Sequence, residues 1–200
     1  YNQLTRDNNG NIEVDQNGNI SMTTSSTPTK VGDLDADFNL GWTNHFTYKG
    51  IDLGVVLTAR VGGLAYSATQ GILDYYGVSE SSAIARDNGG VPVNNGTVEA
   101  QKYYQTIGTG EGGYGRYYLY SATNVRLQEL SLNYTLPKKW FKNVANVTLG
   151  VVGRNLWMIY CKAPFDPELS ASTSSNYYMN VDYFMQPSLR NIGFNVKVQF

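Results

Sequence analysis

Residues 192–200 read Ile-Gly-Phe-Asn-Val-Lys-Val-Gln-Phe, with an apolar side chain at every even position and glycine or a polar residue at every odd one. Side chains of a β-strand point alternately to its two faces, so this segment predicts a strand with one apolar and one polar face. A half-buried strand of a soluble domain can have the same pattern. A final Phe200 gains little at a frayed soluble terminus, but it suits the aromatic girdle of an outer-membrane barrel. We therefore expect Phe194, Val196 and Val198 to face lipid, and Asn195 and Lys197 to face the lumen or a plug.

The composition of the 200-residue chain is compatible with a membrane barrel and argues against several other classes. Fifteen basic and 16 acidic residues nearly cancel, so the chain lacks the electrostatic footprint of a nucleic-acid-binding protein. The sequence has no run of about 18 apolar residues, so it predicts no transmembrane helix. Cys161 and His45 are the only residues of their types, which makes a disulfide, a metal site or a catalytic dyad improbable. We predict that the protein is not an enzyme and holds no cofactor or metal.

Two adjacent segments, residues 38–48 and 51–61, predict a β-hairpin. The two residues between them, Lys49-Gly50, form the short glycine-containing link that a tight hairpin requires. Each segment has about 11 residues, which is the length that a tilted strand needs to cross the hydrocarbon layer, whereas strands of soluble domains average about 5–6. The apolar residues share one parity, except for Val56: Phe38, Leu40, Trp42, Phe46, Tyr48, Ile51, Leu53, Val55, Leu57, Ala59 and Val61.

A second predicted hairpin joins residues 124–136 to residues 144–157 through a basic, aromatic turn at 137–143. In the first of these strands the apolar residues change phase, because Val125 and Leu127 are odd-numbered whereas those from Leu130 onward are even-numbered. A β-bulge near residues 127–130 would restore a single apolar face. Alternatively, Val125 and Leu127 face a loop or plug above the membrane.

The predicted connections fall into two length classes. The links at 49–50 and 137–143 are short, and those at 62–123 and 158–188 are long. Outer-membrane barrels have short periplasmic turns and long extracellular loops. We therefore expect a periplasmic C-terminus, an extracellular segment at 1–37 that leads into the barrel, and barrel strands with extracellular loops at 62–123 and 158–188 within residues 38–200. A membrane barrel needs about eight strands and leaves no open edge in lipid, so these five strands should belong to a larger barrel.

Several motifs resemble those of the SusC/RagA-type TonB-dependent transporters of Bacteroidetes. Residues 122–137, ATNVRLQELSLNYTLP, are similar to the strand motif A-x-x-V-R-L-(R/K)-x-L-S-L-x-Y-x-(L/F)-P of that family. YKGIDL at 48–53 is similar to the YKGFDL hairpin. VGDLDADF at 31–38 resembles GDPNPDF, from which it departs at Leu34 and Ala36. Two shorter matches, GRNL at 153–156 and FDPE at 165–168, resemble G-x-N-L and (Y/F)-D-P-E.

The resemblance implies an all-β fold, an antiparallel transmembrane β-barrel of about 22 strands with a plugged lumen, of which this chain would be the C-terminal five-strand segment. It also implies an outer-membrane importer of oligosaccharides or peptides. A SusD-like surface lipoprotein would close its extracellular mouth, and TonB would act through an N-terminal part outside this sequence. The residues themselves leave open a non-transport structural or adhesive β-domain, such as a soluble sandwich. A sandwich, however, predicts strands spaced by about 8–12 residues, which the connection at 62–123 does not match.

The candidate contact residues are aromatic. We predict that Tyr103, Tyr104, Tyr117 and Tyr118 of the long loop contact the lipoprotein or a ligand, because tyrosine rings offer a large contact area at low entropic cost. Packing within the loop and membrane girdles explain such tyrosines equally well. Phe200, with its alternating strand, resembles the signal that the outer-membrane insertion machinery reads, and strand pairing with that machinery would be the physical reason.

Two acidic features have a cation-binding alternative. DNNGNI at 7–12 and DQNGNI at 15–20 repeat at a spacing of eight, but an EF-hand loop needs glycine at its sixth position and these have it at the fourth. Asn-Gly turns are therefore the favoured interpretation, and calcium is the alternative. Asp33, Asp35 and Asp37 would share one face if extended, yet a solvated loop is the default for such a charge run. A short helix is predicted within residues 66–76.

Overall fold

The computed structural model describes residues 2–24, 26–27, 29–108, 114–169 and 179–200. The chain divides into two compact units, each built from three separate segments. Unit 1 comprises Tyr1–Asp33, Ala65–Tyr120 and Ser170–Met185, and unit 2 comprises Leu34–Leu64, Ser121–Leu169 and Gln186–Phe200. Among the described residues, no helix is both long enough and apolar enough to cross a membrane.

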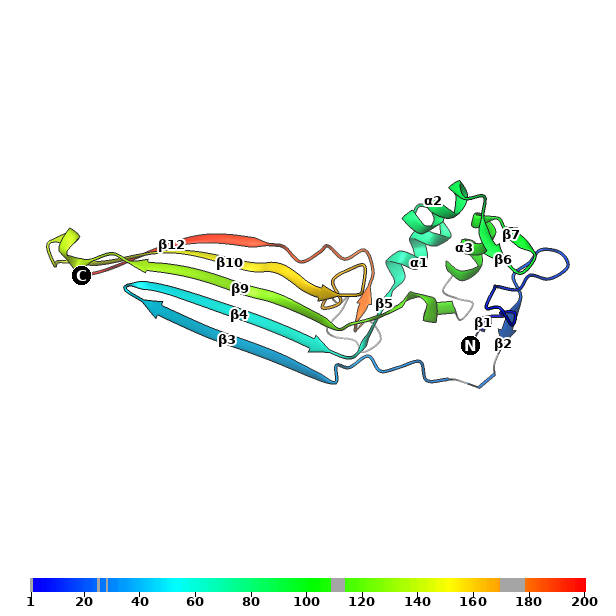
Figure 1. Cartoon of the computed structure of the whole chain (residues 1–200), viewed down its shortest axis with the longest axis horizontal. Helices are drawn as coiled ribbons and strands as arrows, with labels where there is room; N and C mark the ends of the chain where they lie inside the picture. Colours follow the sequence, from blue (N-terminus) through cyan, green and yellow to red (C-terminus); the bar gives the residue numbers. More distant parts are fainter. Residues whose placement is uncertain (1, 25, 28, 109–113, 170–178) are drawn as a thin grey trace. The chain divides into compact units, whose positions relative to one another are not determined.

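Unit 2 is a five-stranded antiparallel sheet with the strand order β12-β10-β9-β4-β3 (Figure 1). The five predicted strands are confirmed, and their bounds shift by at most a few residues. The strands are β3 (Phe38–Tyr48), β4 (Ile51–Val61), β9 (Asn124–Thr135), β10 (Asn146–Cys161) and β12 (Asn191–Gln199). A single-turn 3-10 helix, η2 (Lys138–Phe141), lies in the connection between β9 and β10.

The hairpin of β3 and β4 closes as the sequence predicts. Pairing runs without a shift from Phe38 opposite Val61 to Tyr48 opposite Ile51. The two connecting residues both have a positive φ, 48° at Lys49 and 86° at Gly50. This is the conformation of the primed turns, whose twist matches that of the flanking strands.

The predicted bulge lies in β9 at Gln128. Val56 of β4 pairs with Glu129, and the next residue, Leu57, pairs with Leu127, so Gln128 has no partner in β4. One extra residue on one strand shifts its side-chain phase by one position. The apolar residues on both sides of the bulge therefore share one face of the sheet, and the bulge interpretation is confirmed.

Unit 1 contains short elements around a core of its own. The core residues are Leu4, Ile12, Ile20, Val93, Val98, Ile107 and Tyr118. The helices are α1 (Ala68–Tyr75), α2 (Glu80–Asp87), α3 (Ala100–Gly108) and the 3-10 helix η1 (Tyr114–Tyr118). The strands are β1 (Asn2–Leu4), β2 (Met22–Thr24), β5 (Leu64–Ser67), β6 (Val91–Val93), β7 (Gly96–Val98), β8 (Leu119–Ser121) and β11 (Val181–Asp182).

Local capping explains where the first two helices begin and end. The hydroxyl of Ser67 accepts a hydrogen bond from the backbone N–H of Gln70, and that of Ser79 accepts one from Ser82, both at 3.1 Å. Such N-caps satisfy donors that have no partner within the helix. Gly77, with a φ of 68°, follows α1. The helix predicted within residues 66–76 is confirmed as α1.

The two acidic repeats form tight turns. Asp7 Oδ1 accepts hydrogen bonds from the backbone N–H groups of Asn9 and Asn11, both at 2.8 Å. Asp15 makes the equivalent bonds in the second repeat. Gly10 and Gly18 have positive φ values of 84° and 70°. The turn interpretation is confirmed, because each aspartate closes its own turn.

Candidate membrane-spanning surface and its polar face

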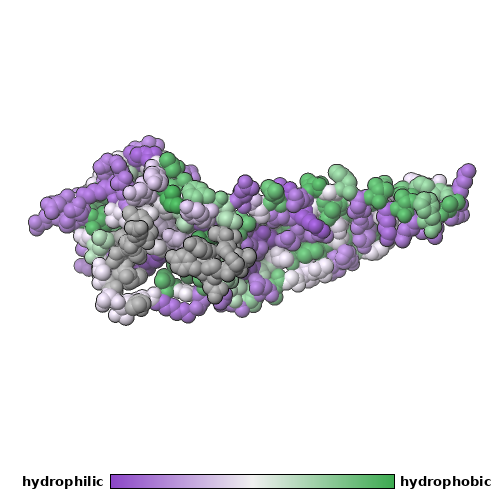
Figure 2. Space-filling view, turned by 180° about the vertical axis from the view of Figure 1, so that it is seen from behind, coloured by the Kyte–Doolittle hydropathy of each residue, from purple (hydrophilic) through white to green (hydrophobic). Residues whose placement is uncertain are grey.

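The strand register places apolar side chains in continuous rows across the sheet of unit 2. One row is Phe46, Leu53, Leu132, Val151 and Phe194. Four of these residues are exposed, at 52% for Phe46, 50% for Leu132, 42% for Val151 and 81% for Phe194. In the space-filling view, hydrophobic side chains lie along the strands of the sheet (Figure 2). An exposed apolar surface of this extent marks an interaction site, because soluble monomers rarely display one.

Aromatic residues lie toward both ends of this apolar face. The row beside the short turns contains Tyr48, Ile51, Tyr134, Leu149 and Val196. A row nearer the opposite end contains Trp42 and Trp157, which are 47% and 61% exposed. An apolar band between two aromatic girdles is the lipid-facing pattern of outer-membrane strands.

The other face of the sheet is polar and hydrogen-bonded. Arg154 Nε donates to Glu129 Oε2 at 2.8 Å, and Thr47 Oγ1 donates to Asp52 Oδ2 at 3.0 Å. The hydroxyls of Thr135 and Thr148 lie 3.0 Å apart. Polar side chains that satisfy one another on one face, opposite an apolar band, are typical of a barrel wall with a polar interior.

Glycines on the polar face make room for this network. A Cβ at Gly150 would lie 2.1 Å from Asn133 Oδ1 and 2.6 Å from the side-chain amide of Asn195. A Cβ at Gly54 would lie 2.5 Å from the hydroxyl of Ser131. These positions need glycine because neighbouring side chains fold over the backbone there, so glycine in a strand here marks a close approach.

A buried ion pair joins β9 to the segment that follows β10. Arg126 Nη2 lies 2.7 Å from Asp166 Oδ1, and the two side chains are only 4% and 8% exposed. Asp166 also accepts hydrogen bonds from the hydroxyl of Ser188 and the backbone N–H of Glu168. Burial by itself would raise the pKa of Asp166, but the hydrogen bonds from Arg126 and Ser188 outweigh it and hold that pKa below its usual range. Such a pair is stable because every oxygen has a donor.

Sequence reasoning missed this pair, although both residues lie in motifs that it singled out. Arg126 belongs to the V-R-L stretch and Asp166 to the FDPE stretch, 40 residues apart. The available signal was an arginine between two apolar residues, Val125 and Leu127, because a charge that becomes buried needs a partner. Nothing in the spacing identified which carboxylate it would find.

The four predicted contact tyrosines come together in unit 1, in or against its core. Tyr118 is 2% exposed, and its hydroxyl donates to Asp74 Oδ2 at 3.1 Å. Tyr117 accepts a hydrogen bond from the backbone N–H of Leu4 at 3.2 Å. The rings of Tyr103 and Tyr104 meet edge to face at 5.0 Å, and burial raises the pKa of Tyr103 to about 12. Packing within unit 1 thus accounts for all four tyrosines. Contact with a partner stays a prediction, and Tyr118 can make such a contact only if the core opens.

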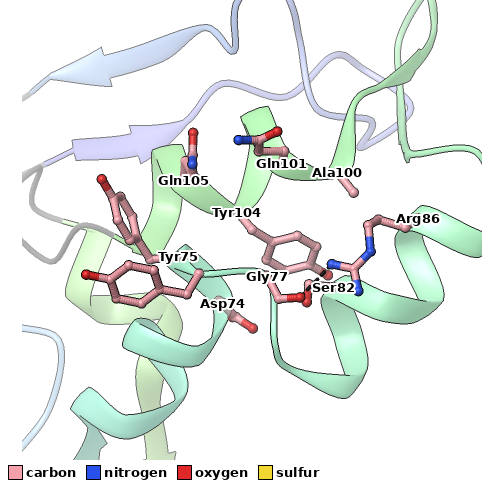
Figure 3. Close-up of a pocket in the computed structure, with 10 residues that line it drawn as sticks. Asp74, Tyr75, Gly77, Ser82, Arg86, Ala100, Gln101, Tyr104 and Gln105 are labelled. Atoms are coloured by element: carbon pink, nitrogen blue, oxygen red, sulfur yellow. Dashed lines mark hydrogen bonds between the residues drawn. The ribbon is translucent and has the colours of Figure 1, made fainter.

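A cavity of 460 Å³ lies among α1, α2 and α3 of unit 1 (Figure 3). The ring of Tyr104, on α3, points toward Ser82 and Arg86 of α2 (Figure 3). The one carboxylate in the lining, Asp74, is fully engaged, because it accepts hydrogen bonds from Gln70, Ser81 and Tyr118. Apart from the guanidinium group of Arg86, which donates a hydrogen bond to the carbonyl of Gly77, the cavity offers neutral amide, hydroxyl and ring surfaces. The sequence did not predict it, since only one of its three helices was expected.

Phe200, the predicted insertion signal, is 97% exposed and follows the end of β12 at Gln199. Its role as a signal stays a prediction. Among the described residues, no group of three or more His, Cys, Asp or Glu side chains is arranged to hold a metal ion. Of the three aspartates at 33–37, Asp33 pairs with Lys30 at 2.8 Å.

Sequence comparison finds similarity to a TonB-dependent receptor. No family model matches it. The TonB-dependent receptor P3 of Formosa agariphila is 26% identical over 197 residues, which cover 96% of this chain and 19% of the relative. The chain thus spans about a fifth of the length of that relative.

Comparison with solved structures identifies proteins with a similar fold. The RagAB peptide importer in its "open-open" state matches with a TM-score of 0.61 and 17% identity, over 95% of this chain and 20% of that one. The RagAB peptide transporter matches with a TM-score of 0.58 and 20% identity, over 92% of this chain and 20% of that one. The predicted fold class, an antiparallel all-β barrel segment, is confirmed. The resemblance to SusC/RagA-type TonB-dependent transporters, first indicated by the motifs, is also confirmed.

Proposed function

We propose that the chain is the C-terminal barrel part of an outer-membrane TonB-dependent nutrient importer. The observation that carries the proposal is the sheet of unit 2, which has five antiparallel strands of 9 to 16 residues with an exposed apolar face and a hydrogen-bonded polar face. Strands of about 9–11 residues suffice to cross the hydrocarbon layer when tilted. In the complete barrel, the apolar face contacts lipid and the polar face lines the plugged lumen.

The proposal includes an orientation in the membrane. The short turns and Phe200 lie at the periplasmic rim, and the connections at 62–123 and 158–188 lie outside the cell, as does the segment at 1–37 that leads into β3. This assignment is supported by the content of unit 1, because Tyr1–Asp33, Ala65–Tyr120 and Ser170–Met185 fold together into one compact body. These segments all adjoin the same ends of the strands, as loops on one rim of an antiparallel barrel must.

The proposed partner is a SusD-like surface lipoprotein, and the proposed substrate is a peptide or an oligosaccharide. The similar solved structures are described as a peptide importer and a peptide transporter, which supports the peptide class. The family resemblance admits both classes. Genes beside the one that encodes this protein distinguish them, because glycoside hydrolases next to a SusD-like gene would indicate a glycan. TonB would act through a part of the transporter outside this chain.

A matched pair of substitutions in the middle of β4 tests the membrane assignment. Val55 pairs with Leu130 on the apolar face, whereas the adjacent Val56 pairs with Glu129 on the polar face. Arginine on the lipid face at mid-bilayer costs about 2–4 kcal/mol. In the full-length transporter, Val55→Arg should lower the amount of folded barrel in the membrane. Val56→Arg should be tolerated, because its charge faces the polar interior beside a carboxylate.

The amount of folded barrel is measured by heat-modifiable mobility in detergent gels of outer-membrane fractions. Val196→Arg gives a graded comparison, because its row lies beside the short turns, where the cost of a charge falls to about 0–1 kcal/mol. Equal yields for the Val55 and Val56 variants would overturn the assignment of faces. A full-length protein that remains soluble without detergent would favour the structural or adhesive alternative.

A further inference from the structure

The connection between β9 and β10 concentrates positive charge in a defined turn. Three lysines, Lys138, Lys139 and Lys142, fall within five residues, and no acidic residue lies between β9 and β10. The turn has a fixed backbone, because the N–H of Asn143 donates to the carbonyl of Lys138 at 3.0 Å and Lys142 adopts a left-handed conformation.

The adjacent hairpin turn adds a fourth lysine at the same end of the sheet (Figure 1). The backbone N–H of Thr135, at the end of β9, donates to the carbonyl of Gly50 at 2.7 Å, which holds the two turns side by side. Lys49 precedes this glycine, and its ammonium group lies 5.1 Å from the centre of the Tyr48 ring. Within the described ranges of the chain, none of the four lysines forms an ion pair.

Exposed apolar side chains accompany these charges. Trp140 is 69% exposed, Val144 is 68% exposed and Tyr48 is 68% exposed. Tyr48 belongs to the row of the apolar face that contains Ile51 and Tyr134, and Trp140 and Val144 lie in the connection between β9 and β10. Lysine and tryptophan at the edge of an apolar band are typical of the interface between hydrocarbon and headgroups, where a ring lies in the boundary and an ammonium group extends into the aqueous layer.

We propose that these two turns form a binding site for the phosphate headgroups of anionic phospholipids, with Lys138, Lys139 and Lys142 as the main ligands. The inference rests on the proposed function, because the turns lie at headgroup level only if the sheet spans a bilayer. Four ammonium groups without an ion-pair partner attract anions, and a turn that continues the lipid-facing band would place them at the level of the membrane phosphates. Attraction of lysines to an anionic surface acts within a Debye length, about 10 Å at 0.1 M salt. An acidic protein would also suit the charge, but the exposed Trp140 and the continuity with the apolar rows favour lipid.

The test uses the full-length transporter in phosphatidylcholine vesicles that contain a minor fraction of a lipid with brominated acyl chains, either phosphatidylglycerol or phosphatidylcholine. Bromine quenches nearby tryptophans, and the difference between the wild type and Trp140→Phe isolates the quenching of Trp140. We expect brominated phosphatidylglycerol to associate at Trp140 at least about fivefold more strongly than brominated phosphatidylcholine, the factor that one lysine at an anionic surface contributes. High salt should reduce this preference.

Three variants identify the cause of the preference. The triple substitution Lys138→Gln, Lys139→Gln and Lys142→Gln should abolish it, and the corresponding triple substitution to arginine should retain it. Lys162→Gln, which removes an exposed lysine outside the turns, should leave it unchanged. Equal quenching by the two lipids in the wild type, an unchanged preference in the glutamine variant, or loss of preference in the arginine variant would each overturn the inference.

Quenching of two other tryptophans shows whether a negative result contradicts only the lipid-binding site or also the proposed function. Trp42 and Trp157 lie on the apolar face, away from the lysine turns. If neither brominated lipid quenches them, the sheet does not lie in the bilayer, and the proposed function is wrong. If both lipids quench them equally while Trp140 shows no preference, the sheet spans the membrane and only the lipid-binding site is wrong.

Discussion

The side chain whose environment departs most from the rest of the sheet is Arg126. Its partner, Asp166, is 8% exposed and has a pKa held below the usual range. A carboxyl group with a lowered pKa in the folded state contributes stability that is complete above its unfolded pKa and is lost as the pH falls through the folded value. The segment after β10 should therefore stay attached to β9 near neutral pH and detach only in strong acid, below the ordinary pKa of an aspartate, about 3.9.

Asp166→Asn should release this segment at neutral pH, because it leaves the buried Arg126 with only the more distant and partly exposed carboxylate of Glu168 as a charged partner. Breaking one side of a buried pair costs about 3–5 kcal/mol. Hydrogen exchange of the amides around residues 163–168 in the full-length transporter measures the effect. Glu168→Gln is the matched control. Its carboxylate lies farther from the same Arg126 nitrogen, at 3.4 Å, and its side chain is 39% exposed, so its removal should change exchange little. Equal exchange in the two variants would contradict this account of the pair.

Tyr118 gives a second prediction at this scale. Its hydroxyl is one of three donors to Asp74, and the buried Asp74 Oδ2 receives it. Burial, together with the nearby Asp74, raises the pKa of Tyr118, so the neutral hydroxyl is the form that donates. Tyr118→Phe should destabilise unit 1 by about 1–3 kcal/mol, because a buried acceptor then lacks its donor. Faster hydrogen exchange in α1 would report this loss, and Tyr76→Phe, at a side chain that is 72% exposed, should leave exchange unchanged.

Among the elements, the five strands of unit 2 were predictable, whereas the short strands of unit 1 and most of the helices were not. Alternation over 11 residues identified β3 and β4 to the residue, because a lipid-facing strand must repeat its apolar side chains with period two. The change of phase in β9 was enough to locate a bulge. By contrast, α2 and α3 have only 8 and 9 residues, and their stability comes from packing in unit 1 rather than from a periodic pattern. For the same reason, the cavity among these helices could not be predicted from the sequence.

The last strand carries the prediction for an element. β12 pairs with β10 on one side and forms one edge of the sheet, so its other edge is open for pairing with another strand. Phe200 is 97% exposed, and its removal therefore costs this sheet almost no packing. Deleting Phe200 should slow insertion and leave precursor in the periplasm, because the insertion machinery would lose the ring that anchors strand pairing.

Pulse-chase fractionation of the full-length transporter measures the rate of insertion. Phe200→Tyr keeps a ring at the terminus and should insert normally. Insertion of the deleted form at the wild-type rate and level would show that Phe200 is a girdle residue and not a signal.

At the scale of the molecule, the two units differ in where their apolar side chains lie. Among its described residues, unit 2 has no large buried core of its own and exposes apolar side chains, which suits a wall that lipid and neighbouring strands complete. Unit 1 has an apolar core built from the segment before β3 and from the connection between β4 and β9. A connection as long as 62–123 is uncommon unless it is functional or disordered, and the described residues of this one form three α-helices and a 3-10 helix. An ordered body assembled from loops provides a stable surface on which a partner can dock.

We therefore predict that the connection at 62–123 is needed to bind the SusD-like lipoprotein. Replacing it with a tight turn in the full-length transporter removes α1, α2 and α3, and co-purification of the lipoprotein should be lost. Tyr104→Ala tests the same surface with less disruption, because Tyr104 is half-buried and lines the cavity, and a central aromatic contact typically contributes at least about 2 kcal/mol to binding. The barrel must still insert, which heat-modifiable mobility establishes. Undiminished recovery of the complex from the shortened transporter would exclude this connection from the docking site and direct the search to the segments at 1–37 and 158–188.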